Sequence, residues 1–200
     1  PPPRYAYIAP LYSQGKDAAW VYLKQGARQI PDAKINESEL IVTYPNGASC
    51  RIYGADNPDR LRGPYLDGVV LDESADMKPE AYEEVISPQL ADFSGWAVFI
   101  GTPKGRDAFY KIWVRACENP DKWYALKLPV SETKLISEEE LADQREHKSE
   151  AQYNREWECS FDEPNVDQFI SGVDVNAARA RKSVPQGPRV MGVDVARFGD

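Results

Sequence analysis

Two short apolar runs constrain the fold of this chain more than any other feature. The first ends at Val69-Val70-Leu71, the second covers residues 96–100, and neither alternates strictly between apolar and polar positions. Continuous apolar strands are buried on both faces, as in a parallel sheet that helices cover on each side. Residues 80–86 predict the helix that connects them, with Pro79 suited to its first turn. The sequence therefore predicts an α/β fold.

Other segments fit further strands and helices of the same sheet. Asn46 and Gly47 separate two β-rich runs, and Asn-Gly in that place is a strong hairpin signal. Gly26 is placed to end an amphipathic helix that precedes the hairpin. We expect strands at residues 5–9, 40–44, 48–53 and 123–128, and helices at residues 17–25 and 107–117. The last of these strands is expected to extend the parallel sheet.

After residue 130 the pattern becomes helical and strongly charged. Ser137 and Glu140 have the spacing of a capping box, in which the serine caps a helix and the glutamate reaches back to the cap. Tyr153, Trp157 and Phe161 recur at helical spacing in a second helix. We expect these three aromatic side chains to pack the helical region on the preceding sheet domain.

The charge and the reactive side chains narrow the possible functions. The formal net charge is −8 and the sequence pI is near 4.9, whereas domains that coat DNA by charge alone are usually basic. Three cysteines without a CxxC pair and a single histidine, His147, argue against zinc-thiolate sites and Ser-His-Asp catalysis. No apolar run has the ~20 residues needed to span a bilayer. Catalysis by this chain must therefore rest on carboxylates, lysine and arginine.

An acidic pair follows the first apolar run. Asp72 and Glu73 come directly after Leu71, so a parallel sheet places both carboxylates at its carboxyl edge, where α/β folds bind ligands. In a nucleotide hydrolase the first acid of such a pair holds Mg²⁺ through water, and the second orients and polarises the attacking water. An acidic loop after a strand is common, so the pair taken alone favours a solvated loop over a catalytic site.

Thr102 occupies the corresponding place after the second apolar run, within residues 101–105. A small polar side chain there is able to contact the attacking water and the next loop, and so to transmit hydrolysis to a moving part. The alternative is a strand-exit turn that uses glycine and proline for its backbone geometry. The position after the acidic pair favours the functional interpretation.

Two arginines and one further acid complete the candidate residues. Arg60 and Arg62 lie in a loop with Pro and Gly, and they suit contacts with DNA phosphates, an arginine finger, or a solvated loop. Residues 183–188 predict a linker, and a new strand follows with Asp194 inside it. Because an uncompensated acid in an apolar strand is costly to bury, Asp194 is a candidate metal ligand of a two-metal nuclease, or an exposed acid at a strand edge.

Taken in order, these segments resemble the large terminase subunit of tailed bacteriophages, a family that pumps DNA into empty capsids with an ATPase domain and cuts it with an RNase H-like nuclease. The segments that carry the resemblance are Tyr7-Ile8-Ala9-Pro10, the hairpin, Arg60-Leu61-Arg62-Gly63, Leu71-Asp72-Glu73, Gly101-Thr102-Pro103-Lys104-Gly105 and Gly192-Val193-Asp194. The resemblance implies a partial P-loop (ASCE-type) NTPase parallel sheet over residues 1–130, a helical linker region over 131–186, and the first strand of an RNase H-like nuclease domain over 187–200.

The resemblance also implies roles, with ATP and Mg²⁺ as cofactors and Mg²⁺ or Mn²⁺ for the nuclease. In the ATPase, Asp72 corresponds to the Walker B acid that binds Mg²⁺, Glu73 to the catalytic glutamate, and Thr102 to the coupling motif. The arginine finger is expected at Arg62, with Arg60 as the alternative. The first metal-binding acid of the nuclease is expected at Asp194, with Asp200 as a further candidate.

The chain departs from the family pattern at its phosphate-binding loop. No Gly-x-x-x-x-Gly-Lys-[Ser/Thr] occurs, and Gly15-Lys16-Asp17 lacks both the upstream glycine and the hydroxyl that binds Mg²⁺. We expect the Walker A segment upstream of Pro1 and the later nuclease acids beyond Asp200. The chain is therefore interpreted as an internal piece of a longer protein, inactive by itself in both reactions.

The partners implied by the resemblance are double-stranded DNA, the portal protein, the small terminase subunit and further copies in a ring on the procapsid. The implied location is the cytoplasm of the infected bacterium, with no membrane association. Two other interpretations stay open, a helicase-like DNA translocase and a non-catalytic docking module in phage assembly. Neighbouring sequence distinguishes them, since a translocase predicts a second motor domain downstream and a docking module predicts a parent without a P-loop.

Overall fold

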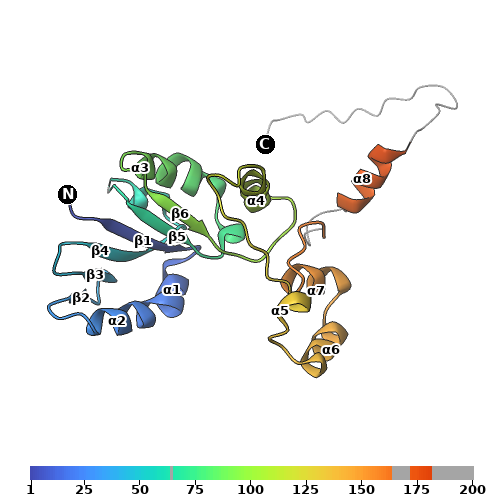
Figure 1. The fold of residues 1–200 in the computed structure, drawn as a ribbon, viewed down its shortest axis with the longest axis horizontal. Coiled ribbons are helices and arrows are strands. Elements are labelled where there is room, and N and C mark those ends of the chain that lie inside the picture. The colour runs from blue at the N-terminus through green and yellow to red at the C-terminus, as the bar shows by residue number, and fades with distance from the viewer. Residues whose placement is uncertain (64, 164–171, 182–200) are drawn as a thin grey trace, which may run out of the picture.

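The computed structural model describes residues 1–63, 65–163 and 172–181. A sheet flanked by helices lies at one end of the molecule, and a group of short helices lies at the other (Figure 1). The predicted linker at residues 183–188 and the strand that contains Asp194 lie outside the described residues.

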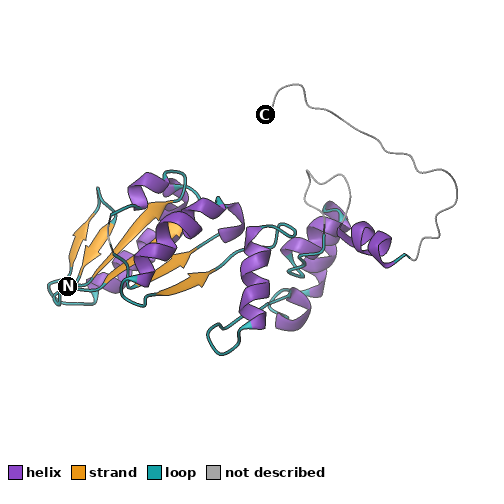
Figure 2. Cartoon of the chain, turned by 90° about the horizontal axis from the view of Figure 1, so that it is seen from above, coloured by secondary structure: helices purple, strands orange, loops and turns teal. Residues whose placement is uncertain are grey.

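The sheet has six strands in the order β2-β3-β4-β1-β5-β6, seen as one layer in Figure 2. Its strands are β1 (Arg4–Ala9), β2 (Lys34–Asn36), β3 (Ile41–Thr43), β4 (Ser49–Gly54), β5 (Gly68–Leu71) and β6 (Trp96–Phe99). Strands β4, β1, β5 and β6 run parallel, while β2 and β3 are antiparallel at one edge. The predicted α/β class and mainly parallel sheet are confirmed.

The β3–β4 hairpin forms where Asn46 and Gly47 predict it. Gly47 has φ +84°, a left-handed conformation that suits glycine, and its N–H donates to the Tyr44 carbonyl at 2.9 Å. The Asn46 side chain accepts from the Ala48 N–H at 3.0 Å, and Tyr44 pairs with Ala48 across the turn. Local turn chemistry therefore sets the register of this hairpin.

One face of the sheet is covered over β3 and β4 by a helix that is longer than predicted. It comprises α1 (Tyr12–Gly15), the π-helical segment η1 (Lys16–Trp20) and α2 (Val21–Arg28). The prediction that Gly26 ends this helix is wrong. The next residue, Ala27, is buried with Trp20 against Leu40, Val42 and Ile52, so packing on the sheet favours continuation of the helix through the glycine.

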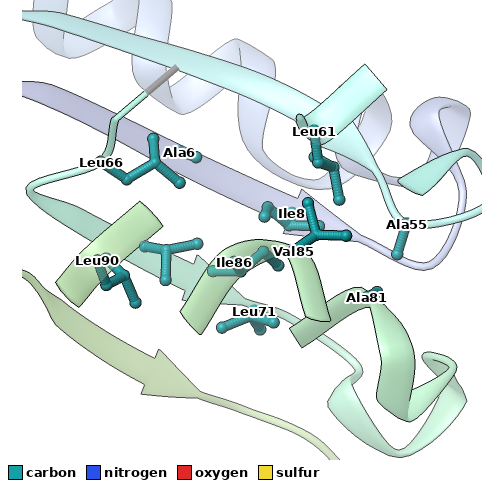
Figure 3. Packing of buried hydrophobic residues seen from close by; sticks show 11 residues of the cluster. Ala6, Ile8, Ala55, Leu61, Leu66, Leu71, Ala81, Val85, Ile86 and Leu90 are labelled. Atoms are coloured by element: carbon teal, nitrogen blue, oxygen red, sulfur yellow. The ribbon is translucent and has the colours of Figure 1, made fainter. Parts of the chain in front are cut away.

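The opposite face is covered by η4 (Ala81–Ile86) and α3 (Ser87–Ala91), which extend the helix predicted at residues 80–86. Figure 3 shows Val85, Ile86 and Leu90 from these helices against Ile8 and Leu71 from the strands. Ile8, Val69 and Ile86 have no solvent exposure. This cluster fixes the carboxyl ends of β1 and β5, from which the candidate site is built.

The predicted strand at residues 123–128 does not form. The preceding helix, α4 (Ala108–Glu118), is confirmed, and Asp107 caps it by accepting from the Tyr110 N–H at 3.0 Å. Tyr124, Leu126 and Leu128 then alternate outward as exposed side chains. A groove of about 550 Å³, lined by Val98, Ile100 and residues 122–128, separates this segment from β6, so the two backbones do not pair.

The helical region contains α5 (Val130–Thr133), α6 (Glu138–His147), α7 (Glu150–Glu156) and α8 (Gly172–Ala180). Ser137 caps α6 as predicted, at 3.2 Å from the Glu140 N–H, but the Glu140 carboxylate accepts from Gln144 instead of reaching back. A complete capping box occurs at Ser149 and Gln152 of α7. None of the helices in the described ranges is long and apolar enough to cross a membrane.

The three aromatic residues of this region divide between two contacts. Phe161 packs on α4, with its ring centroid 5.3 Å from that of Tyr110 and 5.9 Å from that of Trp113. Tyr153 and Trp157 stack on each other at 6.4 Å. The expected packing against the preceding domain is therefore made by Phe161, which lies beyond the end of α7.

Candidate functional site

The carboxyl ends of β1, β5 and β6 meet at one edge of the sheet. Ile8 is in register with Leu71, and Leu71 is in register with Phe99, so the loops that follow these strands begin side by side. Asp72, Glu73 and Thr102 are all placed at this edge, as the sequence predicts for a parallel sheet.

Asp72 is held by hydrogen bonds on both carboxylate oxygens. The Tyr7 hydroxyl of β1 donates to Oδ2, and the Glu73 backbone N–H donates to Oδ1 at 3.1 Å. The Asp72 N–H in turn donates to the Ile8 carbonyl at 2.9 Å, which continues the β1–β5 pairing by one residue. The carboxylate is half-buried, and its rotation is fixed by groups from the sheet and from its own loop.

The pKa of the Tyr7 hydroxyl is strongly raised. Burial raises the pKa of Tyr7 first, and the hydrogen bond to Asp72 and the negative charges of Asp72 and Glu73 raise it further. A phenolate at this position would face two carboxylates, so the phenol stays protonated and acts as the donor.

Glu73 differs from its neighbour in both backbone and side chain. Its backbone is left-handed, with φ 51° and ψ 46°, a conformation that is costly for a residue with a Cβ. Its side chain is exposed, and within the described residues no hydrogen bond or ion pair engages its carboxylate. The loop therefore presents the Glu73 carboxylate to solvent beside the ordered Asp72.

The turn that contains Thr102 is tied to the loop after Asp72. The Ser74 N–H donates to the Ile100 carbonyl at 2.8 Å, and Lys104 forms an ion pair with Asp76. A Cβ on Gly101 would lie only 3.1 Å from the Ser74 nitrogen, so the glycine allows this close approach. These contacts hold the two loops together.

Arg60 and Arg62 are not joined to the acidic pair. Both are exposed, and Arg62 pairs with Asp59 at 3.2 Å on the short helix η2 (Pro58–Leu61). Leu61, which lies between the two arginines in the sequence, is buried in the core and holds this helix in place. No ion pair connects either arginine to Asp72 or Glu73 in the part of the chain that the structure describes.

The carboxylate oxygens at this edge of the sheet suit a magnesium ion that is bound mainly through water and phosphate. Among residues 1–63, 65–163 and 172–181, no group of three or more His, Cys, Asp and Glu side chains has the arrangement of a metal site. Mg²⁺ is commonly held by one or two carboxylates together with waters and substrate phosphates, and a single oriented Asp72 meets that requirement. Asp194 and Asp200 lie outside the described residues.

Sequence reasoning missed Tyr7, Asp76 and Lys104. Tyr7 lies in an apolar run, and its link to Asp72 depends on the parallel register that places Tyr7 opposite Val70. The Lys104–Asp76 pair joins residues 28 apart through two turns. Neither relation has a local sequence signal, because each joins segments that are far apart in the sequence.

Comparison with known proteins gives a consistent family. The family model described as "Terminase large subunit, T4likevirus-type, N-terminal" matches residues 4–173. The large terminase subunits of Thermus phage G20c and Thermus virus P23-45 are each 47% identical over 60 residues, which is 30% of this chain. That match spans 12% of the length of either relative.

Solved structures share the fold. The large terminase ATPase domain of Thermus phage P74-26 superposes with a TM-score of 0.68 and 24% identity, over 80% of this chain and 77% of that domain. A large terminase from another thermophilic bacteriophage, solved in complex with ATP-gamma-S, gives a TM-score of 0.62 and 14% identity, over 80% of this chain and 40% of its own.

Proposed function

The chain belongs to the terminase large-subunit family, and we propose that it supplies the magnesium-binding and water-activating residues of the ATPase that drives viral DNA packaging. The observation that carries the proposal is the juxtaposition of Asp72 and Glu73 at the carboxyl edge, tied to the turn that contains Thr102. The complex of a thermophilic phage's large terminase with ATP-gamma-S supports a nucleotide as the ligand of this fold.

In the proposed site the two acids have different tasks. Asp72, with its rotation fixed, holds the waters of a nucleotide-bound Mg²⁺, and the ion when bound supplies charge neutralisation for the β- and γ-phosphates. Glu73 orients the attacking water and accepts its proton, because its carboxylate is free and exposed. Loss of the γ-phosphate then alters the loop at residues 72–76, and the Ser74–Ile100 bond passes the change to Thr102.

We propose that the phosphate-binding loop of this site lies outside the 200 residues, because they contain no Gly-x-x-x-x-Gly-Lys-[Ser/Thr] sequence. We expect the chain by itself to hydrolyse no ATP. The exposed Arg62, or Arg60, is proposed to reach the nucleotide of a neighbouring subunit in a ring on the procapsid. Double-stranded DNA, the portal protein and the small subunit are the other proposed partners, in the cytoplasm of the infected bacterium.

The ATPase proposal is tested in the full-length terminase that contains this sequence. Glu73→Ala should lower ATP turnover by at least roughly 100-fold, the contribution typical of a general base, while nucleotide affinity is retained. Glu80→Ala, which removes an exposed acid from the following helix, is the matched control. Turnover by the Glu73 variant close to that of the control contradicts the assignment.

An endonuclease activity is proposed for the same full-length protein, with Asp194 as the first metal-binding acid. Asp194→Ala should abolish DNA cleavage that depends on Mg²⁺ or Mn²⁺ and leave ATP turnover unchanged, because the two sites use separate acids. Cleavage is measured on linear double-stranded DNA, with Asp121→Ala as the control. Cleavage that persists in the Asp194 variant assigns this acid a structural role.

A further inference from the structure

Tyr7 reaches the candidate site from a neighbouring strand. It lies opposite Val70 in the β1–β5 pairing, and Asp72 follows two residues later on the same face of the sheet. The tyrosine ring therefore spans from the middle of β1 to the carboxyl edge, where its hydroxyl donates to Asp72 Oδ2.

The ring that carries this hydroxyl is fixed by packing. Tyr7 contacts the buried cluster that Trp20, Val42 and Ile52 form beneath the helix of residues 12–28. A phenol has only two side-chain torsions, and both are restricted when the ring packs against such a cluster. The hydroxyl is thus presented by the sheet core and is independent of the loops that carry Glu73 and Thr102.

The second hydrogen bond to Asp72 comes from the loop side of the site. The Glu73 N–H on Oδ1 belongs to the loop itself, in its left-handed turn. An ionised carboxylate has about four lone-pair directions, so two donors leave acceptor capacity on both oxygens for waters of a metal ion. Without the Tyr7 hydroxyl, the orientation of Asp72 would depend only on the conformation of its own loop.

We propose that Tyr7 is a positioning residue of the ATPase site, which orients Asp72 for magnesium from the rigid part of the sheet. The proposal rests on the proposed function of Asp72 as the magnesium-binding acid. It separates two duties within the site: Tyr7 keeps the acid in place through the catalytic cycle, while the Glu73 side of the loop is free to respond to the nucleotide. Partners that orient a metal-binding group typically change metal affinity or activity by 10- to 100-fold when they are removed.

The test compares Tyr7→Phe with Tyr5→Phe in the full-length terminase. Tyr5 lies two residues earlier on the same strand and face, stacks on Trp96 at 6.0 Å, and makes no hydrogen bond through its hydroxyl within the described residues. Both variants lose one phenolic hydroxyl from β1 and keep the ring. Steady-state ATP turnover is measured as a function of Mg²⁺ concentration, and melting temperature is measured for each variant.

We expect Tyr7→Phe to raise the Mg²⁺ concentration for half-maximal turnover by roughly 10-fold, with a smaller fall in kcat at saturating Mg²⁺. Tyr5→Phe should leave the magnesium dependence unchanged. Equal magnesium dependence of the two variants overturns the proposal. A melting temperature of Tyr7→Phe more than about 5 °C below that of Tyr5→Phe also overturns it, since the hydroxyl is then structural.

The Glu73→Ala variant separates this inference from the proposed function. If Glu73→Ala retains ATP turnover, the ATPase assignment fails, and the positioning role of Tyr7, which depends on that assignment, fails as well. If Glu73→Ala is inactive and Tyr7→Phe behaves like Tyr5→Phe, only the positioning role of Tyr7 fails. In an Asp72→Ala background, Tyr7→Phe should cause no further loss of magnesium-dependent nucleotide affinity, because the two side chains act as one unit. An additional loss there overturns the proposal.

Discussion

Two halves of the same sheet face differ in how they are covered. Over β4 and β3, the helix of residues 12–28 leaves Val42 and Ile52 with 0% exposure. Over β6, Trp96 is 50%, Val98 42% and Ile100 49% exposed. Strand register places these side chains on one face, because Tyr7 is opposite both Ile52 and Val70, and Val70 is opposite Val98. We call them the covered half and the open half.

The open half keeps the sequence of a strand that is buried on both sides. Residues 96–100 are apolar throughout, yet only Ala97 and Phe99 contact the core cluster beneath η4 and α3. Contiguous exposed apolar surface of this kind marks an interaction surface on soluble proteins. The two halves show that an apolar strand sequence does not by itself mean that both faces of the strand are buried.

The largest expected difference between the two halves is in the stability lost when a buried or an exposed isoleucine is replaced by alanine. Ile52→Ala removes a side chain with no exposure and is expected to lower the free energy of unfolding by about 2–5 kcal/mol. Ile100→Ala, the same change in the open half, should cost less than about 1 kcal/mol because nothing packs over half of that side chain. Urea unfolding measures both. Equal losses would remove the distinction between the halves.

Cys50 gives a pH-dependent measure of the covered half. It lies opposite Val42 and Tyr5, and burial raises the pKa of its thiol to about 11. Because the folded pKa exceeds that of the unfolded chain, the stabilising contribution is complete below about pH 8.5 and is lost as pH rises toward 11, by roughly 2 to 3 kcal/mol in all.

The pH dependence is checked by urea unfolding between pH 8 and 11 for the wild type and for Cys50→Ala, whose stability should lack this decline.

Modification by a thiol reagent is an independent measure of the burial of Cys50. Native Cys50 should react much more slowly than the exposed Cys117, and a Val98→Cys side chain in the open half should react as readily as Cys117. Modification of native Cys50 as fast as that of Cys117 contradicts the burial that raises the pKa of its thiol.

A charge in the open half should change stability little. Val98→Lys is expected to shift the melting temperature by no more than about 2 °C, because the side chain is 42% exposed. Thermal melting measures the effect. Val42→Lys, at a position with no exposure, is expected to unfold the protein. A large fall in melting temperature for Val98→Lys would show that this side chain is packed as tightly as those of the covered half.

The smallest effect is expected at the boundary of the open half, where Lys104 pairs with Asp76. Lys104→Ala should change the free energy of unfolding by less than about 1 kcal/mol, because both side chains are 42% exposed. In the full-length terminase the same change should affect ATP turnover and DNA packaging unequally, since the pair ties two loops of the proposed site. Proportional changes in both activities would assign the pair no part in coupling.

The predictable parts of the structure are those with a local physical cause. Asn46-Gly47 predicts the hairpin because the turn itself requires those conformations, and the two apolar runs predict strands β5 and β6. The expectation that both faces of each strand are buried is wrong for β6, where Trp96 and Val98 are exposed. The acidic pair and Thr102 meet at one edge because parallel strands share a carboxyl end. These steps need no knowledge of distant contacts.

The sequence predictions that fail depend on contacts between residues that are far apart in the sequence. Gly26 does not end its helix because Ala27 and Trp20 gain burial on strands far along the chain. Residues 123–128 have the alternation of a strand, but a strand also needs a neighbouring backbone, and the groove beside β6 separates the two. Tyr7 could not be predicted as a site residue, because its position beside Asp72 depends on the register of β1 with β5. Sequence patterns describe what a segment is able to form, and tertiary contacts select among those forms.

The left-handed backbone of Glu73 has a consequence for the stability of the fold. Glycine adopts that conformation freely, so replacing the glutamate by glycine should make the fold more stable by about 1 kcal/mol while removing the acid proposed to activate water. Stability of the fold therefore favours glycine at position 73, whereas the proposed activation of water requires the glutamate.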